Sequence, residues 1–254
     1  MRSHGLISVL VGLTMLSTIA CGCDSDDISN SLEGCDITLS PGEDDQTTVQ
    51  TAFIESPENS TICLKSGTYQ FDKEISLSTN NVTIKGVSRD ATVLDFTNQT
   101  IGANGFAITG DNVSVENLKV LNTPGDGIRA TGVKNIAFRG VAVIWEAASS
   151  VDNGAYGLYP VESEGVLVDD CLVVGSRDAG IYVGQSRYIL VQNSEVYGNV
   201  AGIEIENSRY AEVINNHAHD NTGGILVFDL PELPNKDGQK TKVQNIYAEY
   251  PEQD

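Results

Sequence analysis

The sequence predicts an all-β solenoid in which short parallel strands stack coil upon coil. A motif of one glycine followed by alternating apolar residues recurs through residues 105–227. Its first apolar positions are spaced 22, 30, 23, 22 and 22 residues apart, at Phe106, Ile128, Leu158, Ile181, Ile203 and Ile225. A unit this short cannot bury its own apolar face, so it must pack against its neighbours. We therefore expect a parallel β-helix of about eight coils, each of about 22 residues.

The first 20 residues are typical of an export signal. Arg2 supplies a positive start, and residues 6–19 form an apolar run that is too short to span a membrane. The segment ending in Ala20 and Cys21 resembles the lipobox of bacterial lipoproteins, which implies acylation of Cys21. Gly22 follows, and by resemblance to sorting in diderm bacteria it favours the outer membrane. We expect a lipid-anchored protein of the bacterial cell envelope, the alternative being an ordinary signal peptide with a chance cysteine.

Residues 21–60 are expected to form an acylated tether and an N-terminal cap, because they are rich in Asp, Ser, Glu and Gly and show no helical periodicity. Cys35 and Cys63 flank the cap, and an oxidising envelope permits a disulfide between them. Four cysteines outside the lipobox allow three pairings, so the partners of Cys23 and Cys171 stay open. Cys171 follows a buried strand and is expected to be a free thiol.

Residues 61–248 are expected to form the β-helix itself. A second apolar series, including Val115, Phe138, Val168 and Val191, alternates with polar residues as strands do. Gly, Asn and Asp interrupt every segment and exclude long helices. Two or three short strands and their turns in about 22 residues correspond to one coil of a parallel β-helix.

Polar residues recur two positions after members of the second apolar series. They are Asn117, Asp170, Asn193, Asn215 and Asn245. We expect these side chains to point inward and to bond one another at the strand spacing of about 4.8 Å, because an inward amide without such a ladder would be unpaired.

At this point the chain resembles the right-handed parallel β-helix proteins. Residues 66–69 through 81–86 look like the opening coil of that superfamily, and the resemblance extends over residues 60–246. Residues 223–231 look like one family of envelope β-helix lipoproteins of uncharacterised function. The resemblance implies the fold and its handedness, but it assigns no reaction.

Residues 249–254 are expected to be a tail. A β-helix end exposes unpaired strand edges and needs a cap. Glu249, Pro251, Glu252 and Asp254 discourage strand pairing but hardly cover an edge. The sequence is therefore typical of a chain that is truncated, or whose last coil is poorly closed.

The charge balance limits the class of partner. Thirty-five acidic residues against fifteen basic ones give a formal charge of −20. Such a chain repels nucleic acid and anionic lipid surfaces, so membrane contact is expected through the lipid anchor only. A polysaccharide or another envelope protein remains as the expected partner, and a polyanionic glycan is disfavoured.

Residues that point outward at equivalent positions of successive coils predict a surface suited to sugars. Aromatic faces stack on sugar C–H groups, and carboxylates and guanidinium groups bond hydroxyls. The expected ligand-binding residues are Arg129, Trp145, Tyr156, Tyr159, Arg177, Tyr182 and Glu206. Trp145 begins the insertion of the 30-residue coil, where it either anchors the loop or offers a platform to the ligand. The alternative for the whole set is ordinary solvent-facing strand residues.

Catalysis is the less favoured hypothesis. The candidates for acid or base chemistry are Asp152, Asp178, Glu204, His219 and Asp220. His217 and His219 point outward together and suggest a metal site with Asp220, an acid–base pair, or plain surface residues. His219-Asp220 matches only half of the Asp-Pro-His-Asp motif of epimerase-like β-helices. We expect no bound metal or cofactor; calcium is conceivable but nothing in the sequence supports it.

Three functions remain open from the sequence. The first is a glycan-binding face, whether it only holds or also processes the polysaccharide. The second is a non-catalytic scaffold for another envelope protein. The third is a polysaccharide lyase, hydrolase or epimerase, for which the sequence does not single out a carboxylate pair.

Overall fold

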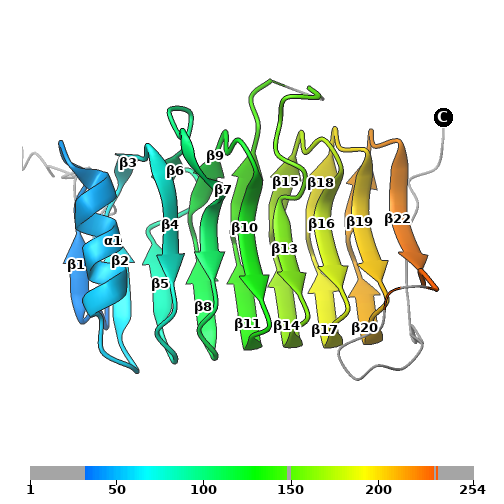
Figure 1. The fold of residues 1–254 in the computed structure, drawn as a ribbon, viewed down its shortest axis with the longest axis horizontal. Helices are drawn as coiled ribbons and strands as arrows, with labels where there is room; N and C mark the ends of the chain where they lie inside the picture. Colours follow the sequence, from blue (N-terminus) through cyan, green and yellow to red (C-terminus); the bar gives the residue numbers. More distant parts are fainter. Residues whose placement is uncertain (1–31, 148–149, 232, 234–254) are drawn as a thin grey trace, which may run out of the picture.

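The computed structural model describes residues 32–147, 150–231 and 233. Three parallel sheets run along the length of the solenoid and enclose one core, as the stacked arrows in Figure 1 show. From β2 onward each coil contributes one strand to each sheet, so consecutive strands along the chain lie in different sheets. The fold prediction is confirmed: the chain forms a parallel β-helix, and its longest sheet has eight strands.

The first sheet contains the strands that begin each coil. Its eight members in spatial order are β1 (Ile37–Leu39), β2 (Thr61–Leu64), β5 (Thr83–Gly86), β8 (Val113–Glu116), β11 (Lys134–Arg139), β14 (Glu164–Asp169), β17 (Arg187–Gln192) and β20 (Arg209–Ile214). Their inward residues include Val115, Phe138 and Val168, which lie in register and are fully buried.

The second sheet has the shortest strands. Its seven members are β3 (Gly67–Gln70), β6 (Thr92–Asp95), β9 (Lys119–Leu121), β12 (Ala142–Ile144), β15 (Leu172–Val174), β18 (Glu195–Tyr197) and β21 (His217–His219). From β9 onward each strand has three residues, of which the central one points into the core.

The third sheet carries the glycine motif of the repeat. Its seven members are β4 (Lys73–Leu77), β7 (Ile101–Ile108), β10 (Asp126–Thr131), β13 (Leu158–Val161), β16 (Ala179–Gly184), β19 (Ala201–Glu206) and β22 (Gly223–Phe228). Ile181 pairs with Ile203 and Ile203 with Ile225, so the repeated apolar residues form the single file that the spacing predicts.

A helix absent from the prediction covers the N-terminal end of the stack. Helix α1 (Asp45–Glu55) begins after Asp44, whose carboxylate accepts a hydrogen bond from the Thr47 backbone at 3.2 Å. Val49 and Phe53, one turn apart, are buried, and Phe53 stacks on Phe106 with ring centroids 5.2 Å apart. Two buried apolar residues are too few to show a helical period in the sequence, which is why the sequence did not reveal the helix.

The cap is also held by a covalent link. A disulfide joins Cys35, just before β1, to Cys63 in β2. Cys171 is a buried free thiol whose pKa is raised by burial to about 12. Cys21 and Cys23, with the expected signal and the tail at 249–254, lie outside the described residues.

The predicted inward ladder is wrong by one residue. Asn117, Asp170, Asn193 and Asn215 adopt left-handed backbone conformations with φ of 52–55°, and the last three are exposed. Asn and Asp tolerate this conformation, which turns the chain between the first and second sheets. The turn reverses the inward–outward alternation, so the following residue points inward instead. Asn245 lies outside the described residues.

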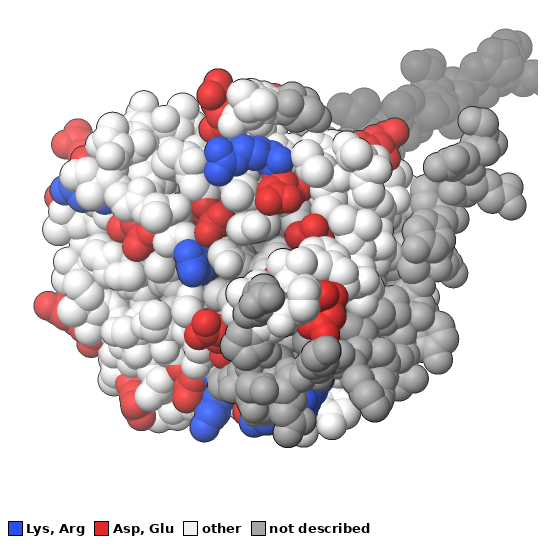
Figure 2. All heavy atoms as spheres, turned by 45° about the vertical axis from the view of Figure 1, so that its right-hand side comes forward, with Lys and Arg blue, Asp and Glu red and all other residues white. Residues whose placement is uncertain are grey.

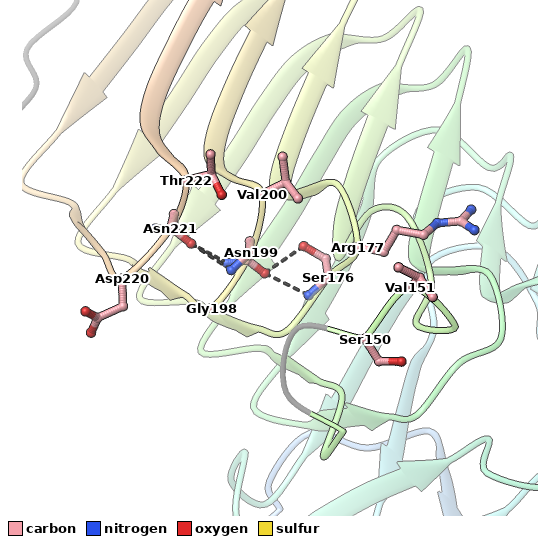
Figure 3. Close-up of a pocket in the computed structure, with 10 residues that line it drawn as sticks. All are labelled: Ser150, Val151, Ser176, Arg177, Gly198, Asn199, Val200, Asp220, Asn221 and Thr222. Carbon is pink, nitrogen blue, oxygen red and sulfur yellow. Dashed lines mark hydrogen bonds between the residues drawn. The ribbon is translucent and has the colours of Figure 1, made fainter.

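Small polar residues form the actual ladders inside the turns. Ser194 Oγ accepts a hydrogen bond from the Cys171 backbone at 3.1 Å, and Asn216 Oδ1 accepts one from the Ser194 backbone at 3.0 Å. Figure 3 shows a second ladder, in which Asn199 Oδ1 accepts from the Ser176 backbone at 2.9 Å and Asn221 Oδ1 accepts from the Asn199 backbone at 2.9 Å. These bonds satisfy buried polar groups at the corners of the coil.

Candidate functional site

The outer surface of the third sheet gathers aromatic and charged side chains. Because side chains alternate along a strand, the residue that follows each inward apolar residue points outward. These outward residues are Arg129 on β10, Tyr159 on β13, Tyr182 on β16 and Glu204 on β19. We call the group Asp126, Arg129, Tyr156, Tyr159, Arg177, Asp178, Tyr182, Glu204 and Glu206 the tyrosine–carboxylate face. Eight of these nine residues are in the set predicted from the sequence to bind ligand or catalyse, and Asp126 is the exception.

Three tyrosine rings pack together at the centre of this face. Tyr156 lies 4.6 Å from Tyr159 and 4.7 Å from Tyr182, and Tyr159 meets Tyr182 edge-on at 4.9 Å, all between ring centroids. The rings rest on Ala179 and Ala201, whose small side chains leave room for them. Tyr156 and Tyr159 are partly exposed, whereas Tyr182 is buried beside them. The cluster forms a small apolar patch beside the charged residues of this face.

Carboxyl groups border the tyrosines on one side. The Tyr182 hydroxyl donates to Glu206 Oε2 at 2.8 Å. Glu204 is only 9% exposed, and this burial, with the negative charges of Asp178 and Glu206, raises its pKa to about 7. Burial and the charge of Asp178 also raise the pKa of the Tyr156 phenol. Glu204 can therefore hold a proton near neutral pH, as a general acid must.

An arginine and a second buried carboxyl border the tyrosines on the other side. The Arg129 guanidinium lies over the Tyr159 ring, 4.9 Å from its centroid, and 3.9 Å from Asp126 Oδ2. Burial raises the pKa of Asp126 to about 6, although the positive charges of Arg129 and Arg177 oppose the shift. Asp126, the first residue of β10, was not among the site residues predicted from the sequence. Its burial depends on packing between coils, which the residue pattern does not report.

A pocket adjoins this face at the turns that lead into β16, β19 and β22. Its volume is about 340 Å³, and its lining includes Ser150 and Val151 of the insertion with Arg177, Val200 and Asp220. In Figure 3, Arg177 and Asp220 lie at opposite ends of the view. Arg177 joins the pocket to the tyrosine–carboxylate face, since its charge also acts on Asp126. The insertion therefore forms a wall of this pocket.

Two of the predicted site residues in the insertion do not reach the tyrosine–carboxylate face. Trp145 is 3% exposed, and its indole N–H donates to the Thr123 carbonyl at 2.6 Å. Of the two roles that the sequence left open for Trp145, the structure supports the loop anchor, because its buried ring offers no platform to a ligand. The physical reason is that the buried indole N–H is satisfied by a backbone carbonyl of the preceding coil, which holds the ring inside the loop. Asp152 is exposed in the loop, where its backbone N–H donates to Ser150 Oγ at 3.2 Å.

The histidine candidates lie on another surface. His217 and His219 are on β21 in the second sheet, with ring centroids 4.3 Å apart, and Glu195 on β18 faces both. Asp220 Oδ2 lies within hydrogen-bond distance of His219 Nδ1, at 2.8 Å. This hydrogen bond and the one to Glu195 raise the pKa of His219. His219 and Asp220 are thus separated from Glu204 and do not form one catalytic group with it.

The molecular surface agrees with the strongly acidic composition. Figure 2, which brings the C-terminal end of the stack forward, shows acidic side chains scattered among uncharged atoms with fewer basic ones. A second exposed aromatic pair lies on the first sheet: Tyr188 and Tyr210 stack with centroids 5.1 Å apart. This pair lacks a buried carboxyl with a raised pKa among the described residues, which distinguishes it from the tyrosine–carboxylate face.

Residues 104–237 match the family described as the right handed beta helix region. The chain belongs to this family. The match covers most of the third sheet and all of the tyrosine–carboxylate face. No curated protein matches the sequence significantly.

Solved structures share the right-handed β-helix fold at low sequence identity. Gene product 12 of bacteriophage phi29, in its pre-mature form, aligns with a TM-score of 0.61 and 16% identity over 78% of this chain and 30% of its own. The catalytic domain of a GH87 α-1,3-glucanase in complex with nigerose aligns with a TM-score of 0.53 and 14% identity over 83% of this chain and 38% of its own. The chain thus spans about a third of these proteins, and the likeness establishes the fold alone.

Proposed function

We propose that the tyrosine–carboxylate face of this β-helix binds a polysaccharide. The observation that carries the proposal is the triad of tyrosine rings, with centroids 4.6–4.9 Å apart, beside hydrogen-bonding carboxylates and an arginine on one sheet face. Sugar rings present C–H faces to aromatic rings and hydroxyls to charged acceptors and donors. The face extends across β10, β13, β16 and β19, a span that suits an extended chain of several sugars.

The charge of the face favours an uncharged sugar. Four carboxyl groups, those of Asp126, Asp178, Glu204 and Glu206, outnumber the guanidinium groups of Arg129 and Arg177. The whole chain carries −20, so a polyanionic glycan would be repelled both at long range and at the site. The α-1,3-glucanase that shares the fold has been solved with nigerose, and this supports a sugar ligand for such a scaffold.

Replacing Tyr159 with alanine is expected to weaken polysaccharide binding about tenfold or more, because an aromatic platform at the centre of a contact carries much of its energy. Binding is measured on a glycan array and then by calorimetry with the best glycan. Tyr188→Ala is the matched control, since it removes an exposed tyrosine of the stacked pair on the first sheet.

The comparison of these two variants decides the location of the site. Loss of binding in Tyr159→Ala with wild-type binding in Tyr188→Ala supports the tyrosine–carboxylate face. The reverse pattern would move the site to the first sheet. Wild-type chain that binds no glycan and co-purifies with an envelope protein would favour the scaffold hypothesis instead.

Processing of the bound polysaccharide is the second candidate function. The specific observation in its favour is Glu204, a buried carboxyl whose pKa is raised to about 7 beside the carboxylates of Asp178 and Glu206. A protonated carboxyl next to an ionised one is the pairing that glycoside cleavage uses. Its test is the Glu204→Gln variant discussed below.

We also propose that the protein is a lipoprotein of the bacterial envelope. The proposal rests on the short apolar segment at 6–19 and on the lipobox-like residues that end at Cys21, which lie outside the described residues. In the described part of the chain, no helix is both long and apolar enough to cross a bilayer. A lipid on Cys21 would hold the β-helix at the surface of a membrane.

Cys21→Ser is expected to abolish labelling by a radioactive fatty acid and to shift the protein from the membrane to the soluble envelope fraction. The reason is that serine lacks the thiol that is acylated. Cys171→Ser serves as the control, because Cys171 is buried in the solenoid. Equal labelling of wild type and Cys21→Ser would contradict the proposal.

A further inference from the structure

We propose that Glu195, His217 and His219 form a binding site for a divalent transition-metal ion, with zinc as its representative. The site lies on the outer surface of the second sheet and is separate from the tyrosine–carboxylate face. It is formed by two consecutive coils, because Glu195 on β18 pairs in register with His217 on β21. His217 and His219 are two residues apart on one strand, so both project from the same side of the sheet.

The ligand atoms are close enough to share one ion. One donor atom from each of the three residues lies within 4.8 Å of the others. Glu195 Oε1 is 3.1 Å from His219 Nε2 and 3.9 Å from His217 Nδ1. Metal–ligand bonds of about 2.0–2.2 Å in a tetrahedral site place neighbouring donor atoms about 3.3 Å apart. The observed separations bracket that value, so small side-chain rotations suffice to close the site.

Asp220 orients His219 for this role. Its Oδ2 lies 2.8 Å from His219 Nδ1, the ring nitrogen that faces away from Glu195. When Nδ1 donates its proton to Asp220, the neutral ring presents the lone pair of Nε2 toward the carboxylate of Glu195. Two acceptors 3.1 Å apart repel unless a proton or a metal cation lies between them. A carboxylate that fixes the outer nitrogen of a ligating histidine is a common support of zinc sites.

A stacked tyrosine also restrains the histidine. The rings of Tyr197 and His219 stack with centroids 4.9 Å apart and planes 20° from parallel. Tyr197 occupies the position on β18 that pairs with His219 on β21. His219 is thus held by a ring on one coil and by a carboxylate at the following position in the chain. Its donor nitrogen is already placed before any ion binds.

The donor set selects the class of metal. Two imidazoles and one carboxylate suit zinc and its transition-metal neighbours, whereas calcium and magnesium take oxygen donors. The site therefore differs from the calcium considered from the sequence. The Glu195 and His217 side chains are 51% and 60% exposed, so an ion can enter directly from solvent. Three protein ligands leave one tetrahedral position for water or a further ligand.

The test is a zinc titration of the full chain, purified without a polyhistidine tag, against a chromophoric chelator. We expect saturation at one zinc ion per chain, and no comparable competition by calcium. His219→Gln and Glu195→Gln should each weaken zinc binding at least tenfold, because each removes one of three ligands. Asp220→Asn should weaken it about 10–100-fold without changing the stoichiometry.

A matched control and a second readout keep the test independent of folding. Glu212→Gln removes an exposed carboxylate on β20 of the first sheet and should bind zinc as the wild type does. Zinc should raise the melting temperature of the wild type and of Glu212→Gln but not that of His219→Gln, because an ion bound only by the folded state stabilises it. Equal zinc affinity in all variants, or non-saturating binding, would overturn the proposal.

Discussion

Replacing Phe138 with alanine is expected to lower the free energy of unfolding by about 3–5 kcal/mol. Phe138 is fully buried on β11, between Val115 of the preceding coil and Val168 of the following one. Truncation of the ring removes apolar contacts and leaves a cavity in the middle of the stack. Neighbouring coils cannot collapse into the cavity, because backbone hydrogen bonds on both sides fix their spacing.

The measurement is urea unfolding followed by circular dichroism. Ile54→Ala is the control, because Ile54 is a large apolar residue of α1 that is 69% exposed, and its truncation should change stability by no more than about 0.5 kcal/mol. Equal destabilisation by the two substitutions would contradict the placement of the core. A smaller loss in Phe138→Ala than in Ile54→Ala would do so more strongly.

The repeat of the core could be predicted because stacking in register is a strict physical requirement. Ile181, Ile203 and Ile225 must meet the same core from successive coils, so their spacing reports the coil length directly. The same alternation placed Tyr182 and Glu204 on the outer face of the third sheet. Whatever follows from strand periodicity was therefore accessible from the sequence.

Features that depend on single turns were not accessible. A left-handed residue at Asn193 or Asn215 shifts the alternation by one, so the inward polar residues are Ser194 and Asn216. Nothing in the residue pattern fixes where the reversal occurs, since Asn favours both a ladder and a left-handed turn. The prediction consequently identified an inward polar ladder but assigned it to the wrong residues.

Contacts between coils limited the prediction of the sites in another way. Glu195 faces the histidines because β18 pairs with β21, and this requires the register of the second sheet. The sequence instead suggested Asp220, which is adjacent in the chain and binds the other nitrogen of His219. Trp145 was ambiguous for the same reason, as its partner, the Thr123 carbonyl, lies one coil earlier.

Glu204→Gln is expected to flatten the dependence of stability on pH. The pKa of Glu204 is raised from an ordinary 4.5 to about 7 in the folded protein, so the folded state holds this proton more tightly than the unfolded state. Between about pH 4.5 and pH 7 the folded state therefore binds more protons, and the free energy of unfolding falls as pH rises through this window. Glutamine does not titrate, so the variant lacks this contribution. Asp126, with a pKa of about 6, contributes with the same sign in both proteins.

Melting temperatures from pH 4.5 to pH 8 measure this difference. The wild type and Glu212→Gln should lose more stability across the window than Glu204→Gln, because Glu212 is exposed on another sheet. Parallel profiles for Glu204→Gln and the wild type would show that the buried carboxyl does not hold its proton as described. The outcome does not depend on any ligand.

The same variant separates binding from processing of a polysaccharide. If Glu204 donates a proton to a departing sugar oxygen, Glu204→Gln should lower turnover about 10²–10⁴-fold and leave glycan affinity nearly unchanged, since glutamine keeps the shape but cannot act as an acid. Wild-type turnover should also fall as pH rises above about 7, where Glu204 ionises. Undiminished turnover in the variant would exclude this role. A wild-type face that binds glycan without any product would leave binding as its function, because a raised pKa reflects burial whether or not a reaction follows.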